Sequence, residues 1–371
     1  MAVEAAAVAA RLAEAGHTGV AGRVNRPLIR AIGEAGLLPR LFPRRAGGSR
    51  DRGVLAVDLC AVREALAAVS TEVENAVAIQ TLGGYPIVLS GADEAVSRWV
   101  TPIARGEAVA AFALTEPAAG SDVGALELRA ERDGWGFRLS GTKAFISNAP
   151  DADVYTLFAR TTPGGGTRGI TAFIVNGDAP GLSGTPIELL SAHPIGRLEL
   201  DGVFVPGDQV LSEVDHGFKL AMRTLDLFRP SVGASVVGIA QAALDAAIAH
   251  ADSRTAFGRP IREFQAVSHQ VAEMATRLEA ARALVYAAAS AYDADEPHVA
   301  RRSAMAKLFA TETAQQVVDM AIQVHGAIAL ERGHLLEHLY REVRAPRIYE
   351  GTSEIQREII ARDLFRKDAG S

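Results

Sequence analysis

The chain has 371 residues, of which 49% are apolar, and its formal net charge is -6 with a pI near 5.9. This length and apolar share are sufficient for two or three packed units with a large core. The acidic balance argues against a nucleic-acid partner, because such proteins normally carry a basic patch or stripe. Cys60 is the single cysteine, so no internal disulfide can form, and this usage suits a reducing compartment.

The N-terminal segment predicts no signal peptide. No basic residues precede its Ala-rich run, and Glu4 interrupts it. No stretch of the chain approaches the roughly 18 uninterrupted apolar residues that a membrane span needs. We therefore expect a cytoplasmic protein without a membrane partner.

The apolar pattern divides the chain into three zones. Residues 1–109 have helical spacing, broken by Pro43 and a glycine loop, and predict an N-terminal helical domain. Residues 110–215 show the alternation of strands and predict a β-domain. Residues 216–371 return to helical spacing. The order of helices, sheet and helices predicts an α+β protein, and a cleft between the β-domain and the helical bundle is where we expect a flat cofactor.

Local signals refine these zones. Asp-Gly pairs at 133–134 and 201–202 predict tight turns between strands. Pro230 interrupts a helical run and predicts a kink or a break. An apolar stripe downstream predicts a long helix packed against others. Its residues are Phe264, Val267, Val271, Met274 and Leu278.

The stretch GGGTRG at residues 164–169 formally satisfies the glycine pattern of dinucleotide-binding loops. That mechanism needs a helix after the last glycine, so that the pyrophosphate meets its N-terminus. The residues that follow, ITAFIV at 170–175, have the composition of a strand instead. We therefore expect a hairpin loop here.

A zinc-peptidase pattern, H-x-x-E-H, is formed by His334, Glu337 and His338. The alternative is an amphipathic helix with Leu335 and Leu336 facing inward. No third ligand suggests itself, so we expect no metal site.

A cluster of arginines surrounds a glycine loop near the N-terminus. Such a run is usually a solvated surface, and the alternative is that it meets the phosphates of a thioester carrier. The cluster comprises Arg40, Arg44, Arg45, Arg50 and Arg52.

Four stretches carry the chemistry. The segment ALTEPAAGSDVGA at 113–125 ends a strand and turns, and Gly120 there permits unusual dihedrals. GTKAFISN at 141–148, RTAFGRPI at 254–261 and IYEGTSEIQ at 348–356 follow. Together they resemble, in the correct order, the signature segments of the acyl-CoA dehydrogenase family. The resemblance extends from about residue 82 to 364.

The resemblance implies the family's fold: an N-terminal helical domain, a middle β-domain and a C-terminal four-helix bundle. It also implies an FAD cofactor, a homo-oligomer (typically a tetramer) and an Arg254 that reaches the FAD of a neighbouring subunit. The implied FAD contacts are Phe112, Leu114, Thr115, Gly120, Ser121, Phe145, Ile146, Ser147, Arg254, Phe257, Gln265, Gln323, Gly326, Thr352 and Glu354. The implied substrate contacts are Ser121, Asp226, Arg229, Tyr349 and Gly351.

Glu350 is the implied catalytic base. It precedes Gly351 and a capping sequence, Ser353 with Gln356, ahead of an apolar helix. Removal of an α-proton from a thioester needs a carboxylate with a raised pKa, which burial would provide. The alternative is a helix-terminal charge that interacts with the macrodipole. One branch of the family carries its base at the position of Phe228, which cannot serve here.

The implied reaction is the α,β-dehydrogenation of an acyl thioester to the trans-2-enoyl thioester, with electrons passing to an electron-transfer flavoprotein-type acceptor. A flavin oxidase or monooxygenase on the same fold is the alternative. Three departures from the family are visible: Phe145 replaces a common tryptophan, Ala256 replaces a common hydroxyl residue, and a loop near bound CoA is missing after Gly196. The missing loop leaves open whether the thioester is carried by CoA or by an acyl carrier protein.

Overall fold

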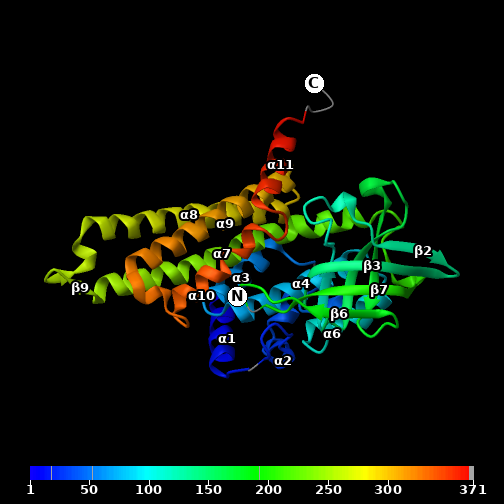
Figure 1. Ribbon diagram of the computed structural model, residues 1–371, viewed down its shortest axis with the longest axis horizontal. Coiled ribbons are helices and arrows are strands. Elements are labelled where there is room, and N and C mark those ends of the chain that lie inside the picture. Colours follow the sequence, from blue (N-terminus) through cyan, green and yellow to red (C-terminus); the bar gives the residue numbers. More distant parts are fainter. Residues whose placement is uncertain (18, 52, 192, 367–371) are drawn as a thin grey trace. The chain divides into compact units, whose positions relative to one another are not determined.

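The computed structural model describes residues 1–17, 19–51, 53–191 and 193–366 (Figure 1). These residues form two compact units. One, here called the helical unit, comprises Met1–Ala10, Leu55–Glu74 and the chain from Asp226 onward. The other, the sheet unit, comprises Arg11–Val54 and Asn75–Leu225.

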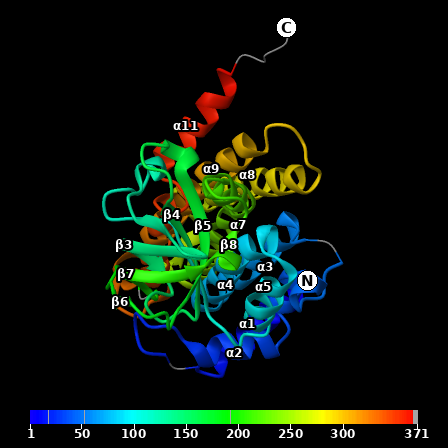
Figure 2. The same ribbon diagram turned by 90° about the vertical axis from the view of Figure 1, so that its right-hand side faces the viewer.

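The sheet unit is built on one eight-stranded sheet. Its order is β6-β7-β3-β2-β4-β5-β8, with β1 paired in parallel to β4, and Figure 2 shows β6, β7 and β3 as neighbours. The strands are β1 (Ala110–Ala113), β2 (Arg129–Asp133), β3 (Gly136–Ser147), β4 (Val154–Arg160), β5 (Ile170–Asn176), β6 (Leu182–Pro186), β7 (Ile195–Pro206) and β8 (Val210–Leu211).

Two of the turn predictions for this sheet are confirmed and one is wrong. The turn at Asp133-Gly134 joins the antiparallel pair β2 and β3, and the GGGTRG stretch lies in the connection between antiparallel β4 and β5. Asp201-Gly202, in contrast, lies inside β7. The β3–β7 register shifts there, between Leu139 and Gly141, so the Asp-Gly pair forms a bulge instead of a chain reversal.

The core of the sheet unit lies around the central strands. Val154 to Ala159 of β4 and Ile170 to Val175 of β5 are buried without alternation, so both faces of these strands are covered. Thr156 is among them, and its hydroxyl donates to the Gly83 carbonyl at 2.9 Å. The core therefore contains polar residues, such as Thr156, that an amphipathic strand would expose to solvent.

The N-terminal zone is helical, as predicted. Its helices are α1 (Ala2–Glu14), α2 (Arg26–Glu34), α3 (Ala56–Ala67), α4 (Thr71–Ser90), α5 (Asp93–Ala95) and α6 (Thr101–Ala104).

The C-terminal part is a bundle in which the long helices α7, α8 and α9 run side by side (Figure 1). α11 packs on α9, and α3 packs on α8. The elements are α7 (Gly217–Ser253), α8 (Gln265–Asp293), α9 (Val299–His325), α10 (Leu335–Glu342) and α11 (Ser353–Leu364), with the short hairpin of β9 (Thr255–Ala256) and β10 (Arg259–Pro260) between α7 and α8.

Pro230 does not split α7, which is assigned as one helix across it. A proline has no N–H, so the carbonyl four residues earlier loses its helical donor. That carbonyl belongs to Asp226, and the hydroxyl of Ser303 on α9 donates to it at 3.0 Å. The helix therefore continues because a neighbouring side chain replaces the missing donor.

The predicted stripe of the next helix is buried only in part. Met274 and Leu278 are 0% and 1% exposed, whereas Val267 and Val271 are half-buried. Phe264 lies just before the helix, as its N-cap residue.

Among the described residues, α7 is the one helix long and apolar enough to cross a membrane. Of its most apolar window, 67% is buried inside the protein, as expected for the central helix of a bundle.

Candidate active site

In the sheet unit, the predicted flavin loop from Phe112 to Ser121 leaves β1 and is fastened to β3. The Leu114 carbonyl accepts a 2.9 Å hydrogen bond from Lys143 Nζ, and the Thr115 carbonyl accepts one of 3.1 Å from the Ala144 amide. The loop and the end of β3, which carries the second predicted flavin segment, therefore lie side by side.

Lys143 was not predicted as a site residue. Its side chain is 0% exposed, and Nζ also pairs with Glu116 Oε1 at 2.8 Å. The Glu116 carboxylate in turn accepts from the amides of Glu127 and Leu128. Burial lowers the pKa of Lys143 to about 8, although Glu116 opposes the shift. The pair holds the first half of the loop against the sheet.

Phe145 is turned out of the sheet by a register shift between Lys143 and Ile146. Its φ is +56°, and its side chain is 52% exposed although the flanking Ile146 is buried. Ser147 ends the strand and is half-buried. A β-bulge that re-aims one aromatic side chain is a common device next to binding sites.

The other predicted residues of this segment have fewer contacts that fix their position. Phe112 lies on β1, and its ring centroid is 5.0 Å from that of Phe158. Gly120 and Ser121 are exposed. Gly120 does not adopt the left-handed conformation that glycine permits, and a Cβ there would meet no atom within 4 Å.

In the helical unit, three predicted FAD contacts lie at the connection of α7 and α8. Arg254 directly follows α7, Phe257 is the tip of the β9–β10 hairpin, and Gln265 begins α8. All three are exposed, and Phe257 is 95% exposed with a φ of +51°.

Gln323 and Gly326, at the end of α9, lie at the same end of the bundle. The rings of His250 on α7 and His325 on α9 stack there, with centroids 4.2 Å apart. Burial lowers the pKa of both histidines, and His334 further lowers it for each. Five of the predicted FAD contacts are thus brought together at one exposed end.

Thr352 and Glu354 lie elsewhere, at the start of α11. The predicted cap was Ser353, but the structure uses Thr352, whose hydroxyl accepts from the Ile355 amide at 3.3 Å. Ser353 instead donates to Glu312 on α9 at 2.6 Å. From Glu312 to Gln323 the helix advances by about 16 Å. The unit therefore holds its predicted FAD contacts in two separate groups.

Glu350 and Gly351 form a left-handed turn before α11, with φ values of +53° and +94°. Gln356 Nε2 donates to both of their carbonyls, at 3.2 and 2.9 Å, instead of closing a capping box. Lys307 Nζ donates to the Gly351 carbonyl at 2.7 Å, and Arg229 Nε approaches the Glu350 carbonyl at 3.4 Å. Side chains from α7, α9 and α11 thus fix a strained turn.

The Glu350 carboxylate is surrounded by charge, but it forms no ion pair with any residue that the structure describes. Burial raises its pKa, and Arg63, Lys307 and Arg229 act in the opposite direction. Oε2 is buried and has no hydrogen-bond partner among the described residues. A buried carboxylate oxygen left without a donor suits the acceptance of a proton.

The predicted substrate contacts of this unit adjoin the turn. Arg229 pairs with Asp226 at 2.8 Å, and burial raises the pKa of Asp226. Tyr349 precedes the base and is 41% exposed. Phe228 is 1% exposed.

The zinc-like pattern is used structurally. His334 is the N-cap of α10, and its Nδ1 accepts from the Leu336 amide. Leu336 is 0% exposed, as predicted, whereas Leu335 is 47% exposed and contradicts the prediction. His338 Nε2 lies 2.8 Å from the Thr71 hydroxyl. Within the described residues, no group of three or more His, Cys, Asp or Glu side chains could hold a metal ion.

The arginine cluster of the sheet unit is largely paired. Arg44 forms an ion pair with Asp51, and Arg45 forms one with Asp93. Arg50 donates to the Arg40 carbonyl. Arg52 lies outside the described residues.

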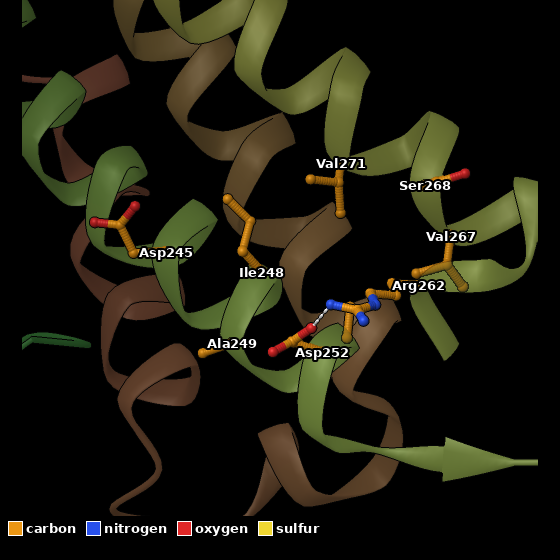
Figure 3. Close-up of a pocket in the computed structure, with 9 residues that line it drawn as sticks. Asp245, Ile248, Ala249, Asp252, Arg262, Val267, Ser268 and Val271 are labelled. Atoms are coloured by element: carbon orange, nitrogen blue, oxygen red, sulfur yellow. Dashed lines mark hydrogen bonds and ion pairs between the residues drawn. The ribbon is translucent and has the colours of Figure 1, made fainter. Parts of the chain in front are cut away.

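A groove of about 390 Å³ lies between the end of α7 and the start of α8 (Figure 3). Its walls include Ile248, Val267 and Val271, and an ion pair of Asp252 with Arg262 crosses it. It contains none of the predicted site residues.

The residues of the two predicted flavin segments and of the α7–α8 connection fit a bound flavin nucleotide. An outward aromatic ring, Phe145, stands beside a loop that is fastened to its own strand. An exposed guanidinium, Arg254, is available for phosphate oxygens, which arginine binds well.

Comparisons with known proteins agree with this chemistry. Models described as the acyl-CoA dehydrogenase N-terminal, middle and C-terminal domains match residues 2–107, 111–203 and 215–365. The chain is 36% identical over 352 residues to cyclohexane-1-carbonyl-CoA dehydrogenase of Geobacter metallireducens. This alignment covers 94% of this chain and 91% of that protein. It is 43% identical to 3-(aryl)acrylate reductase of Clostridium sporogenes, covering 77% and 76%.

Solved structures include a chain from a study titled "Electron transferring flavoprotein of Acidaminococcus fermentans: Towards a mechanism of flavin-based electron bifurcation". It matches with a TM-score of 0.91 and 35% identity, over 99% of this chain and 97% of that chain. With the four signature segments, the three family domains and a relative aligned over nearly its whole length, the chain belongs to the acyl-CoA dehydrogenase family of FAD-dependent oxidoreductases that act on CH–CH bonds.

Proposed function

We propose that Glu350 is the base that removes the α-proton in the dehydrogenation of an acyl thioester to the trans-2-enoyl thioester. The observation that carries this assignment is the buried Oε2 atom, which has no donor within the described residues. Its pKa is raised by burial, and its backbone is fixed at a left-handed turn, so the proton acceptor is both basic and immobile. Bound FAD supplies the acceptor for the hydride from the β-carbon.

We propose that the sheet unit contacts the flavin through two segments, the loop of residues 112–121 and the end of β3 at residues 145–147. Phe145 would stack on the ring system, and Thr115 and Ser147 would offer polar groups to it. The register shift at Phe145 and the Lys143 brace support this role, because both hold an exposed surface in one geometry. The full set is Phe112, Leu114, Thr115, Gly120, Ser121, Phe145, Ile146 and Ser147.

The contacts of the helical unit are proposed to serve two different FAD molecules. The group with Arg254, Phe257, Gln265, Gln323 and Gly326 lies about 16 Å along α9 from the group with Thr352 and Glu354. One group would contact the FAD of its own chain and the other that of a neighbouring copy, in a homotetramer. The 95% exposed Phe257 and the apolar groove of Figure 3 support a second copy packed at this end.

Light scattering of the purified protein would test this arrangement. A monomer that retains one FAD per chain would contradict the shared site. Arg254→Ala should lower FAD retention. The same change at Arg98, an exposed arginine of the sheet unit, is its control.

The substrate is proposed to be an acyl thioester of CoA or of an acyl carrier protein. Asp226, Arg229, Tyr349 and Gly351 adjoin the base turn, and Ser121 lies in the flavin loop. β7 runs without a loop after Gly196, which supports the carrier-protein alternative, whereas the pairing of Arg44 and Arg45 with nearby acids weakens it. Flavin bleaching by matched CoA and carrier-protein thioesters would separate the two.

The acceptor is proposed to be an electron-transfer flavoprotein, in line with the similar solved structure from the study of the Acidaminococcus fermentans electron transferring flavoprotein. The reductase name of one relative favours a second candidate, the reverse reduction of a 2-enoyl thioester by the same residues. Anaerobic titration in both directions decides between them, and peroxide formed in air would indicate the oxidase alternative. We also propose that the chain has three domains, divided at residues 109 and 215. We further propose that the protein is cytoplasmic and has no membrane partner.

The decisive experiment is anaerobic stopped-flow reduction of the flavin in Glu350→Gln. The amide is nearly isosteric but cannot accept a proton, so reduction should slow by about 10²- to 10⁴-fold while FAD stays bound. Glu358→Gln, on the exposed side of α11, is the matched control and should leave the rate unchanged. A Glu350→Gln rate within about tenfold of the parent would contradict the assignment.

A further inference from the structure

A buried ion pair lies among the helices that surround the proposed base. Arg63 on α3 donates from Nε to Glu74 Oε1 on α4 at 2.6 Å, and from Nη1 to the Ser231 hydroxyl on α7 at 2.7 Å. The two charged side chains are only 4% and 8% exposed. Buried pairs of this kind are costly to desolvate, so their geometry is worth a functional explanation.

The charges that act on Glu350 come from four helices. They are Arg63 from α3, Lys307 from α9, Arg229 from α7 and, with opposite effect, Glu74 from α4. α11 faces the turn with the uncharged Gln356.

Each cation is committed to another acceptor. Lys307 bonds the Gly351 carbonyl, Arg229 pairs with Asp226, and Arg63 pairs with Glu74. Within the described residues, none forms an ion pair with the Glu350 carboxylate.

We propose that Glu74 is a positioning residue that holds Arg63 away from Glu350, and so keeps the carboxylate of the base free to accept a proton. This inference rests on the proposed role of Glu350. Arg63 is the candidate partner because it donates to Ser231 on α7, two residues from Arg229, which approaches the Glu350 carbonyl at 3.4 Å. The charge of Glu350 also acts on Arg63. An Arg63–Glu350 ion pair would stabilise the ionised carboxylate and make it a weaker base.

The geometry explains why a glutamate is needed at position 74. A guanidinium with two of its donors fixed by Glu74 and Ser231 cannot rotate toward a third acceptor without breaking both bonds. Removing only the charge at position 74 leaves a buried cation without a counter-ion. Pairing with another carboxylate of the same region would lower that cost, and Glu350 Oε2 is a buried carboxylate oxygen without a hydrogen-bond partner among the described residues.

The test is the pH dependence of anaerobic flavin reduction in three variants. Glu74→Gln should move the midpoint of the profile to lower pH and lower the limiting rate about tenfold. Arg63→Met should move the midpoint to higher pH, because the strongest opposing cation is removed. Arg63→Met/Glu74→Met should fall between Arg63→Met and the parent, because the opposing effect of Glu74 is also lost.

The matched control is Glu64→Gln, the neighbouring residue of α3. Glu64 is also paired, with Arg282 at 2.8 Å, but its charge is not one of those with the largest effect on the pKa of Glu350. Its profile should coincide with that of the parent. If Glu74→Gln does not fold, Arg63→Met and the double variant still test the order of the midpoints, since apolar replacement of a buried pair is usually tolerated.

The possible outcomes distinguish a wrong assignment of Glu350 as the base from a wrong role for Glu74. If Glu350→Gln reduces its flavin at nearly the parent rate, the base assignment fails. If Glu350→Gln is inactive but the midpoints of the three variants coincide with the parent midpoint, only the role of Glu74 fails. A uniform loss of rate without an ordered shift would also overturn it, because a structural role alone would produce that result.

Discussion

Lys307 and Gly351 are joined by a 2.7 Å hydrogen bond from the Nζ atom of a central helix to the backbone carbonyl next to the proposed base. Lys307 is 0% exposed, and burial lowers its pKa to about 8. A buried lysine that donates to a backbone carbonyl beside a left-handed turn fixes the turn, and with it the direction of the Glu350 side chain.

Lys307→Met should therefore slow flavin reduction by about 10²-fold, the usual effect of a misplaced catalytic group. FAD content should be unchanged, and Lys307→Arg should restore part of the rate because it can still donate. Stopped-flow reduction measures both. Lys219→Met makes the same change at an exposed position of α7 and should have no effect.

Gly351→Ala should disrupt the turn more directly. Its φ of +94° is unfavourable for alanine, and a Cβ would lie 2.6 Å from Gln356 Nε2. We expect a loss of about 1–3 kcal/mol in stability and a reduced rate. Gly333→Ala is the matched control, since its φ is +89° but no atom lies within 4 Å. An equal effect on activity in both variants would contradict the role of the turn.

Lys143→Met should destabilise the protein by about 3–5 kcal/mol, because it leaves Glu116 as an unpaired buried charge. Chemical denaturation of the variant measures this loss. Adding Glu116→Gln should recover part of it. A variant as stable as the parent, with unchanged FAD affinity, would mean that Lys143 does not brace the loop.

Glu350→Gln should be more stable than the parent at neutral pH. Burial raises the pKa of Glu350, so the folded protein favours the protonated acid, and the stability that this gives is lost as pH rises through the folded pKa. Glutamine does not titrate. The difference in Tm should vanish below about pH 3, where glutamate is protonated in both states, grow as pH rises from the unfolded to the folded pKa, and level off above it. A Tm difference that does not change with pH would contradict this prediction.

Local patterns predicted much of the fold. The Asp133-Gly134 turn and the strand after the GGGTRG stretch follow from short-range turn and strand chemistry. The Asp201-Gly202 prediction failed because an Asp-Gly pair also suits a bulge, and only pairing with β3 distinguishes the two. The position of the helix cap was off by one residue for a similar reason, since Thr352 and Ser353 are both good caps.

The proposed base was found through its segment, but the charges around it were not. Arg63 and Lys307 occupy buried stripes of their helices, three or four residues from Leu59, Leu66, Ala304 and Ala310. A cation on an apolar stripe is a signal that could have been used. Its partner could not be predicted, because Glu74 and Gly351 come from other elements and only the packed bundle brings them close.

Pro230 and Ser303 are coupled through one hydrogen bond. The Ser303 hydroxyl bonds the Asp226 carbonyl because the proline cannot. Loss of the serine alone would leave the Asp226 carbonyl without a hydrogen-bond donor. An alanine at position 230 would supply a backbone N–H to this carbonyl and make the Ser303 hydroxyl dispensable. Substitutions at the two positions should therefore be non-additive, so that a lineage that abandons the proline becomes free to change the serine.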